Sequence, residues 1–358
     1  MGFKCGIVGL PNVGKSTLFN ALTNSNKAQA ENFPFCTIDP NIGIVAVPDE
    51  RLNKLAKISN SKKKINTKIS FVDIAGLVKG ASKGEGLGNK FLSHIREVDA
   101  IIHMIRCFDS DDIQNVNATV DPVRDLEIIE TEMKLADLDS IQKRLDKKNK
   151  KNVDSEELEM LQMAQKVIDE DGDLTIIRNE FEEKIIKKSG LLIIKPKLYV
   201  CNVDEQSIKS GNNYTENFMK KFGETNTLII SADIENQINE LEDENEKNNY
   251  MKMINITETG LNSLIRKGYE VLSLQTFFTS GPEESRAWTI TKKSRAPNAA
   301  GEIHSDFEKG FIRAETISYE DFLKHNGWLG SKEAGKMRLE GKDYIVKDGD
   351  VLNFRFNT

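Results

Sequence analysis

A glycine-rich motif close to the start of the chain constrains the fold most. It occupies residues 9–17, reads GLPNVGKST, and matches the pattern G-x-x-x-x-G-K-[ST]. An apolar run, residues 3–8, precedes it, and residues 18–22 have the apolar spacing of a first helical turn. A loop between a strand and a helix can place backbone N–H groups and the positive end of a helix dipole around a phosphate. The motif therefore predicts a phosphate cradle. The alternative, a glycine-rich turn without a ligand, leaves the flanking strand and helix unexplained.

The side chains of this motif have predicted roles. Lys15 is expected along the β- and γ-phosphate oxygens of a nucleotide, where it also serves catalysis, and the Ser16 hydroxyl is expected to ligate Mg²⁺. The predicted nucleotide contacts of the motif are Asn12, Val13, Gly14, Lys15, Ser16 and Thr17.

Residues 62–64 are three consecutive lysines and predict a loop. A second motif, D-x-x-G, ends the alternating run that follows at Lys68. Asp73 is predicted to hold Mg²⁺ through a water molecule, and the backbone N–H of Gly76 is predicted to bond the γ-phosphate. Thr37, in the loop after the first helix, is predicted to close onto the same Mg²⁺. Hydrolysis would then release the glycine-rich residues 77–88, which is the behaviour of a nucleotide-controlled switch.

Two strand ends further along the chain are predicted to read the base. Asn202 begins the sequence Asn-Val-Asp-Glu, and a later strand ends in Ser231-Ala232. A guanine site requires Asn-Lys-x-Asp, but here the lysine is replaced by Val203 and the acid is the longer Glu205. The Asn202 amide suits the N7/N6 edge of adenine. The five base-side residues, Asn202, Val203, Glu205, Ser231 and Ala232, therefore favour ATP over GTP, while an Asn-x-x-Glu turn without a ligand is the structural alternative.

Catalysis is expected to be slow. Leu77 follows Gly76, where many GTPases place a glutamine that orients water, and an apolar side chain cannot do so. Hydrolysis would depend on Mg²⁺, Lys15, backbone N–H groups and an additional factor, either a partner or a monovalent cation such as K⁺ near Asn12.

Composition excludes several classes of protein. The chain has 358 residues, a net charge of −6 and 4 widely spaced cysteines without a C-x-x-C pair, which indicates reduced thiols rather than a disulfide framework or a zinc site. No apolar run is long enough to span a bilayer, and no signal-like segment precedes the first strand. A cytoplasmic location and no membrane partner are predicted.

Hydrophobic patterns predict an α/β fold in three parts. Residues 1–122 and 191–278 form a P-loop domain with a mostly parallel sheet, because residues 99–108 and 191–201 are continuous apolar runs. Residues 123–190 have helical periodicity interrupted by a lysine-rich stretch, which predicts an inserted antiparallel helical coiled-coil hairpin. Residues 279–358 form a small β-grasp, ubiquitin-like module, in which residues 343–356 are expected to be a hairpin-like arm.

Long matching strings show that the chain resembles the YchF, or Obg-like ATPase, family over almost its whole length. The strings are residues 1–17, Asn32–Thr37, Asp73–Ala81 and Asp306–Glu315. The resemblance implies a nucleotide domain, a coiled-coil insertion, a C-terminal TGS domain, Mg²⁺-dependent ATP hydrolysis, and binding to the 70S ribosome and its large subunit. It also implies a link to the oxidative-stress response. Members often carry a histidine, thought to help hydrolysis, where this chain has Asn115, so that role is not carried over.

Three further readings stay open at this point. A P-loop kinase would need an arginine-bearing lid, and the D-x-x-G motif opposes it. A nucleotide-gated interaction or stress-regulatory protein, with incidental hydrolysis, and a GTP-using member both share the motifs above. Ribosomal RNA contacts are expected through the helical hairpin and through a basic face of the C-terminal module, for which a solvated surface is the alternative. That face consists of Lys292, Lys293, Arg295, Lys309 and Arg313.

Overall fold

The computed structural model describes residues 3–24, 41–75, 87–110, 119–147 and 155–357. The chain divides into two compact units, and each contains segments that are far apart in the sequence. Unit 1 holds Phe3–Gly43 and Ser70–Leu264, and unit 2 holds Ile44–Ile69 and Ile265–Thr358. Among the described residues, no helix is both long and apolar enough to cross a bilayer.

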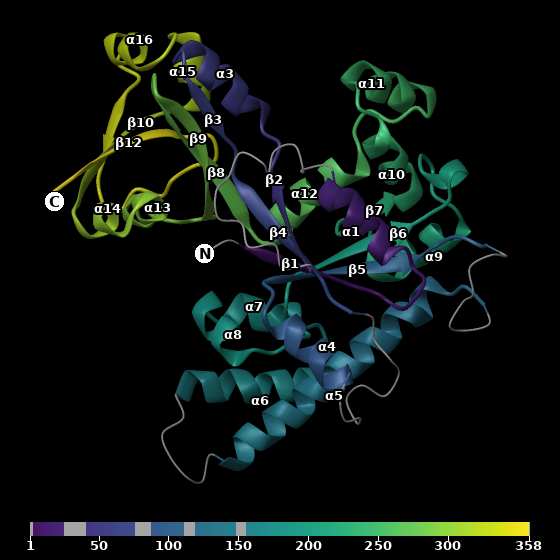
Figure 1. Ribbon diagram of the computed structural model, residues 1–358. Helices are drawn as coiled ribbons and strands as arrows, with labels where there is room; N and C mark the ends of the chain where they lie inside the picture. Colours follow the sequence, from purple (N-terminus) through teal and green to yellow (C-terminus); the bar gives the residue numbers. More distant parts are fainter. Residues whose placement is uncertain (1–2, 25–40, 76–86, 111–118, 148–154, 358) are drawn as a thin grey trace. The chain divides into compact units, whose positions relative to one another are not determined.

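The first sheet, most of which belongs to unit 1, has the order β2-β4-β1-β5-β6-β7 and lies among helices in Figure 1. Strand β1 pairs in parallel with β4 and β5, and β6 pairs in parallel with β5 and β7. All seven residues of β5 are buried, as expected for a parallel strand covered on both faces. The strands are β1 Lys4–Val8, β2 Ile42–Ala46, β4 Lys68–Asp73, β5 Ala100–Arg106, β6 Lys197–Asn202 and β7 Thr227–Ile230.

The helices of unit 1 include the predicted helical insertion. Helix α5 begins with proline, which suits a first helical position, and packs against α6, β5 and α9. The lysine-rich stretch between α5 and α6 lies outside the described residues. The helices are α1 Lys15–Asn24, α4 Leu87–Arg96, α5 Pro122–Lys147, α6 Ser155–Asp169, α7 Thr175–Glu180, α8 Glu183–Ser189, α9 Asn213–Phe222, α10 Ala232–Glu240, α11 Glu244–Met253 and α12 Gly260–Val271, which continues into unit 2, with a 3-10 turn, η2, at Glu205–Ser207.

A buried carboxylate fastens the insertion to the chain that leads into β6. Asp137 of α5 is fully buried and accepts backbone N–H bonds from Leu192, at 3.0 and 2.8 Å, and from Ile193, at 2.8 Å. Burial raises the pKa of Asp137 to about 6, although the two N–H donors oppose this shift. These bonds satisfy backbone groups that no helix or strand pairs, so the segment before β6 has a fixed path.

Unit 2 contains a second, mixed sheet, with the order β11-β10-β12-β8-β9-β3. Strands β8 and β12 are parallel, whereas β8 with β9, and β10 with β11 and β12, are antiparallel. The order β9-β8-β12-β10-β11 is that of a β-grasp fold, and β3 extends it at one edge. The strands are β3 Lys63–Ile65, β8 Leu274–Ser280, β9 Glu284–Thr291, β10 Phe311–Ile317, β11 Arg338–Glu340 and β12 Val351–Phe356.

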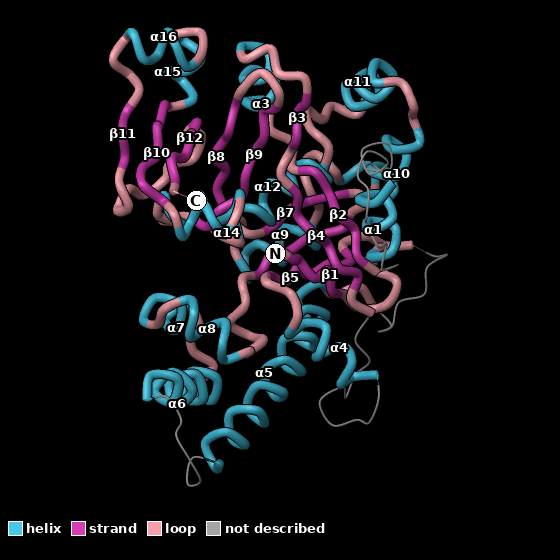
Figure 2. Tube along the Cα trace, turned by 60° about the vertical axis from the view of Figure 1, so that its left-hand side comes forward, coloured by secondary structure: helices cyan, strands magenta, loops and turns pink. Residues whose placement is uncertain are grey.

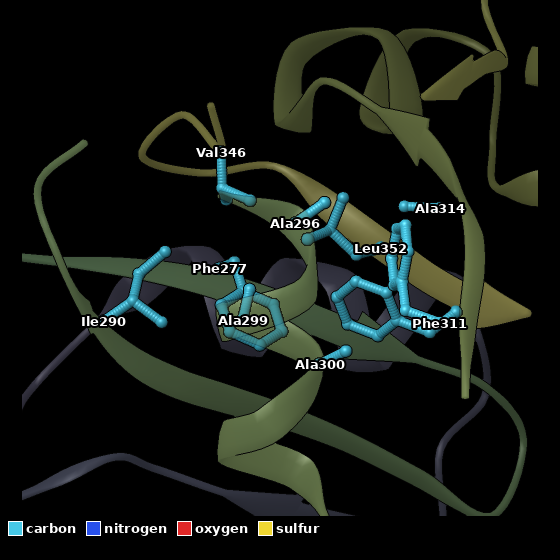
Figure 3. Packing of buried hydrophobic residues seen from close by; sticks show 10 residues of the cluster. Phe277, Ile290, Ala296, Ala299, Ala300, Phe311, Ala314, Val346 and Leu352 are labelled. Atoms are coloured by element: carbon cyan, nitrogen blue, oxygen red, sulfur yellow. The ribbon is translucent and has the colours of Figure 1, made fainter. Parts of the chain in front are cut away.

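Each face of this sheet has its own apolar core. Figure 3 shows the first core, in which α13 places Ala296, Ala299 and Ala300 against Phe277 and Leu352. The second core joins Leu52 and Leu55 of α3 to residues of β8, β9, β10, β12 and α15. The helices of this unit are α3 Glu50–Ile58, α13 Ala296–Ile303, α14 Ser305–Lys309, α15 Tyr319–Lys324 and α16 Trp328–Glu333.

Several contacts build residues 50–65, which carry α3 and β3, into the C-terminal fold. The Arg51 guanidinium donates to Asp348 at 2.6 Å, and the Ser61 hydroxyl donates to the Gly281 carbonyl at 2.7 Å. Strand β3 pairs with β9 in register Lys63↔Glu284. Figure 2 shows α3 and β3 beside β8 and β9, which come more than two hundred residues later in the chain.

The α/β class agrees with the prediction, whereas two local expectations were wrong. Residues 62–64 were expected to form a loop, yet Lys63 and Lys64 belong to β3 because β9 offers them a sheet edge. Residues 343–356 do not form a hairpin arm, since Ile345 bridges to Arg295 while β12 pairs with β10 and β8. The three-domain boundaries stay a prediction, although the division into units moves residues 44–69 out of the predicted first domain.

Candidate nucleotide-binding site

The loop between β1 and α1 has the backbone that the P-loop motif requires. Gly14 has φ +91° and Asn12 has φ +65°, both in the left-handed region. The Leu18 N–H donates to the Gly14 carbonyl at 3.0 Å, which starts α1 directly after the loop. A Cβ at Gly9 would lie 2.7 Å from the Met104 carbonyl oxygen, so this position needs glycine for close packing.

Lys15 and Asp73 form an ion pair between the lysine Nζ and a carboxylate oxygen. Their side chains are 12% and 21% exposed, so the pair is reachable from solvent although it is largely enclosed. In the β1–β4 register, Ile7 lies opposite Asp73, which brings the carboxyl ends of both strands to one place. The structure therefore joins the two motifs that the sequence predicted as the phosphate and magnesium sites.

The residue types predicted to hold Mg²⁺ suit that ion. Ser16 is exposed at the start of α1, and Thr17 beside it is half-buried. A hydroxyl and a carboxylate are the hard oxygen ligands that Mg²⁺ accepts, with water and phosphate oxygens completing its shell. Among the described residues, no group of three or more His, Cys, Asp and Glu side chains is arranged to hold a metal ion.

Asn202 links the phosphate loop to the second loop of the site. Its Nδ2 donates to the Val13 carbonyl at 2.9 Å, and its Oδ1 accepts from the Ala232 N–H at 3.0 Å. Asn202 is 5% exposed and ends β6, beside the end of β7. A Cβ on Gly14 would overlap the Asn202 amide, so this glycine and this asparagine fit one another. The Asn202 Nδ2 has a second N–H, and the Oδ1 has a second lone pair, so each amide atom can make one more hydrogen bond to a ligand.

The remaining predicted base-side residues differ in placement. Ser231, which precedes α10, and Ala232, its first residue, are both buried beside Asn202. Val203 is 3% exposed and packs in an apolar cluster with Cys201 and Phe218, so its side chain belongs to the core. Glu205 is exposed at the start of the 3-10 turn η2.

Comparison with known proteins identifies the family. A family model described as a 50S ribosome-binding GTPase matches residues 4–134, and a YchF GTPase C-terminal model, described as a protein of unknown function, matches residues 274–357. The chain is 51% identical to "Ribosome-binding ATPase YchF" of Escherichia coli O157:H7 over 365 residues, covering 100% of both. The chain belongs to the YchF family. The Bacillus subtilis relative of the same name is 50% identical, also over 100% of both chains.

A solved YchF structure confirms the α/β fold class. The Schizosaccharomyces pombe YchF GTPase is 36% identical to this chain, with a TM-score of 0.83, and the match covers 99% of this chain and 98% of that one. The resemblance inferred from the sequence motifs is thus confirmed, and the fold described above is that of the family.

Two residues of α10, the helix that begins at Ala232, had no predicted role. Glu235 of α10 is 1% exposed and accepts N–H bonds from Gly260, at 2.6 Å, and Leu261, at 3.2 Å, at the start of α12. Burial raises the pKa of Glu235. Asn239, also of α10, donates to the Ala21 carbonyl of α1 at 2.8 Å. An acidic, polar helix gives no signal in its sequence that it packs against the helix of the P-loop.

Several predicted residues lie outside the described part of the chain. These are Thr37, predicted to close onto the metal ion, Gly76 and Leu77 of the second motif, and Asn115 at the position of the family histidine. Their predicted roles stay predictions.

Proposed function

We propose that this YchF-family chain is a Mg²⁺-dependent P-loop ATPase that acts as a nucleotide-controlled switch on the ribosome. The observation that carries the proposal is the Lys15–Asp73 ion pair, because it places a phosphate-binding cation and a metal-binding carboxylate at one point. The relatives named above as ribosome-binding ATPases support the activity and the partner. A cytoplasmic location follows from a ribosomal partner.

Binding of the phosphates would use the backbone N–H groups of residues 12–17 together with Lys15. When nucleotide and metal bind, Lys15 would exchange its contact with Asp73 for phosphate oxygens, which leaves the carboxylate available through water. Ser16, Asp73 and Thr37 would hold Mg²⁺, which neutralises charge on the phosphates. The Gly76 N–H would add a bond to the γ-phosphate, and a monovalent cation such as K⁺ near Asn12 would add further positive charge.

Slow intrinsic turnover is part of the proposal. Leu77 cannot orient an attacking water, so the wild-type protein alone should hydrolyse ATP slowly and ribosomes should raise the rate. Purified protein, assayed at saturating ATP with and without 70S ribosomes or large subunits, tests this. An unchanged rate with bound ribosomes would instead favour a nucleotide-gated interaction protein in which hydrolysis is incidental.

We infer further that ATP is preferred to GTP. The free hydrogen-bonding capacity of the Asn202 amide suits adenine, and the longer Glu205 does not reproduce the aspartate that binds guanine. GTP use is the second candidate, because the matched family model and the solved relative are both described as GTPases. Dissociation constants for ATP and GTP, measured by calorimetry on nucleotide-free protein, decide between them. Equal constants, or tighter GTP binding, would remove the preference.

We propose a three-part organisation for this function. Residues 1–122 and 191–278 would bind the nucleotide, while the helical insertion, 123–190, and the TGS domain, 279–358, would contact ribosomal RNA. The predicted basic face is compensated in part, because Arg295 pairs with Asp343 at 3.1 Å and Arg313 lies near Glu315.

A further inference from the structure

Residues 51–68 carry an unusual concentration of positive charge. They include seven lysine and arginine residues and no aspartate or glutamate, whereas the whole chain has a net charge of −6. This stretch forms α3 and β3 of unit 2. The charge is therefore held on ordered elements of the C-terminal fold, and not on a solvated linker.

The exposed lysines of the two elements form one surface. Helix α3 buries Leu52 and Leu55 in the core and exposes Lys54 and Lys57, three positions apart. Strand β3 is the last strand of its sheet and exposes Lys63 and Lys64. The Lys64 ammonium donates to the Asn53 side chain of α3 at 2.8 Å, which joins the two elements. We call Lys54, Lys57, Lys63 and Lys64 the lysine surface.

The lysine surface follows the edge of the sheet. Alternation along β3 directs Lys63 and Lys64 to opposite faces. Lys64 faces α3, while Lys63 lies on the face that carries Glu284 and Arg286, as the parallel register shows. Figure 1 shows β3 and α3 side by side, beside β9. A long, negatively charged ligand that lies along this edge of the sheet can thus contact ammonium groups on both faces.

Neighbouring cations form ion pairs, but the four lysines of the lysine surface do not. Arg51 pairs with Asp49 at 2.8 Å and with Asp348 at 2.6 Å, and Lys62 pairs with Glu283 at 2.7 Å. Within the described ranges, no ion pair engages any member of the lysine surface. Clustered ammonium groups repel each other at some cost in stability, and an anionic partner removes that cost.

We propose that the lysine surface binds the phosphate backbone of RNA. Lysine is a point charge suited to phosphate contacts without base selection. A membrane surface fits less well, because a peripheral helix needs an apolar face for the lipid and α3 has buried its apolar face in the core. The inference rests on the ribosome binding proposed above and names the surface through which ribosomal RNA is held.

The experiment compares two triple variants of the full chain that remove equal charge. One carries Lys54→Gln, Lys57→Gln and Lys63→Gln. The control carries Lys209→Gln, Lys220→Gln and Lys252→Gln, three exposed lysines outside the domains proposed to contact RNA. Binding to 70S ribosomes and to purified ribosomal RNA is measured from 50 to 300 mM KCl. Each lost phosphate contact lowers the magnitude of the slope of log affinity against log salt by about 0.7 to 0.9, so the first variant should lose about 2 to 3 units of slope. Its affinity at 100 mM KCl should fall at least about tenfold.

The outcomes separate this inference from the proposed function. Failure of the wild type to bind ribosomes overturns the proposed function and the inference with it. Wild-type binding that the first variant retains, or that the control loses equally, overturns the inference alone. A loss on intact ribosomes without a loss on purified RNA also overturns it, because the surface then meets a ribosomal protein. Unchanged melting and basal ATP turnover in both variants show that the fold and the nucleotide site are intact.

Discussion

The two ends of the proposed nucleotide site, its phosphate end and its base end, are built in different ways. At the phosphate end, Lys15 and Asp73 contact each other through a single ion pair that solvent reaches. At the base end, Asn202 is buried, and both atoms of its amide bond to backbone groups of two loops. The phosphate end can therefore change partners without disturbing the fold, whereas the base end is part of the fold. A substitution at the phosphate end should therefore lower turnover without lowering stability, so that the two are separable there. A substitution at the base end should lower nucleotide affinity and stability together.

Lys15→Ala tests the phosphate end and should have the largest effect on turnover. Loss of one preorganised charge at the phosphates should lower the ATPase rate by about 100- to 1,000-fold. The free energy of unfolding without nucleotide should stay within about 1 kcal/mol of wild type, because a partly exposed ion pair contributes little. Steady-state kinetics and urea unfolding measure the two quantities. Lys184→Ala, at an exposed lysine of α8, serves as the control. A large loss of stability in Lys15→Ala would contradict the separation.

Asn202→Ala tests the base end and should lower two quantities at once. It leaves the Val13 carbonyl and the Ala232 N–H without their buried partner, at a cost of about 2 to 4 kcal/mol in unfolding free energy. Nucleotide affinity should fall by about 10- to 100-fold because the two loops are no longer tied together. Asn202→Asp retains the acceptor for Ala232 and loses only the donor to Val13. A variant that binds poorly yet unfolds like wild type would show that the base end is not structural.

A change of base preference is a finer test of the base end. Val203→Lys with Glu205→Asp rebuilds Asn-Lys-x-Asp, and it should weaken ATP binding and strengthen GTP binding. The lysine replaces a valine that is 3% exposed, so the double variant should also lose about 2 to 4 kcal/mol of stability. Glu205→Asp alone, at an exposed position, is the control and should not suffice. An ATP-to-GTP affinity ratio within about threefold of wild type, roughly 0.7 kcal/mol, would place base selection elsewhere.

Glu235→Gln should have the smallest effect, which appears as a change in pH dependence. Because burial raises the pKa of Glu235 above its usual 4.5, the folded protein binds this proton more tightly than the unfolded chain does. The resulting stability is fully present below pH 4.5 and is lost as the pH rises through the folded pKa. Unfolding free energies measured from pH 4 to 7 should thus decline less with pH in Glu235→Gln than in wild type. If the two pH profiles of unfolding free energy are identical, ionisation of Glu235 does not affect the stability of the protein.

Local backbone requirements could be predicted from the sequence, but distant partners could not. The P-loop motif implies glycine conformations and a helix start that depend on a few neighbouring residues, and the structure shows both at Gly14 and Lys15. Asn202 was predicted to read the base, yet its bonds to Val13 and Ala232 join residues 189 and 30 positions away. Val203 illustrates the same limit, because a turn motif does not tell which side chain points into the core.

Residues 62–65 show the limit for the fold as well. Three lysines before one isoleucine have the composition of a solvated loop. Residues 63–65 form a strand because Glu284–Arg286 of β9, more than two hundred residues later, offers a parallel edge. Strand pairing of this kind depends on a partner that no local pattern reveals, so β-propensity alone does not predict it.

The discontinuous build of unit 2 has a consequence for any fragment of the protein. A piece that starts at Ile265 would lack α3 and β3, and the apolar side chains of Phe278, Phe322 and Val351 would lose the cover that Leu52 and Leu55 give them. Such a fragment is expected to aggregate through the exposed apolar side chains. It would do so although its strands β8 to β12 contain the whole strand order of a β-grasp fold. For the same reason, recombination between genes cannot transplant this module as one contiguous stretch, because its interior is encoded in two places.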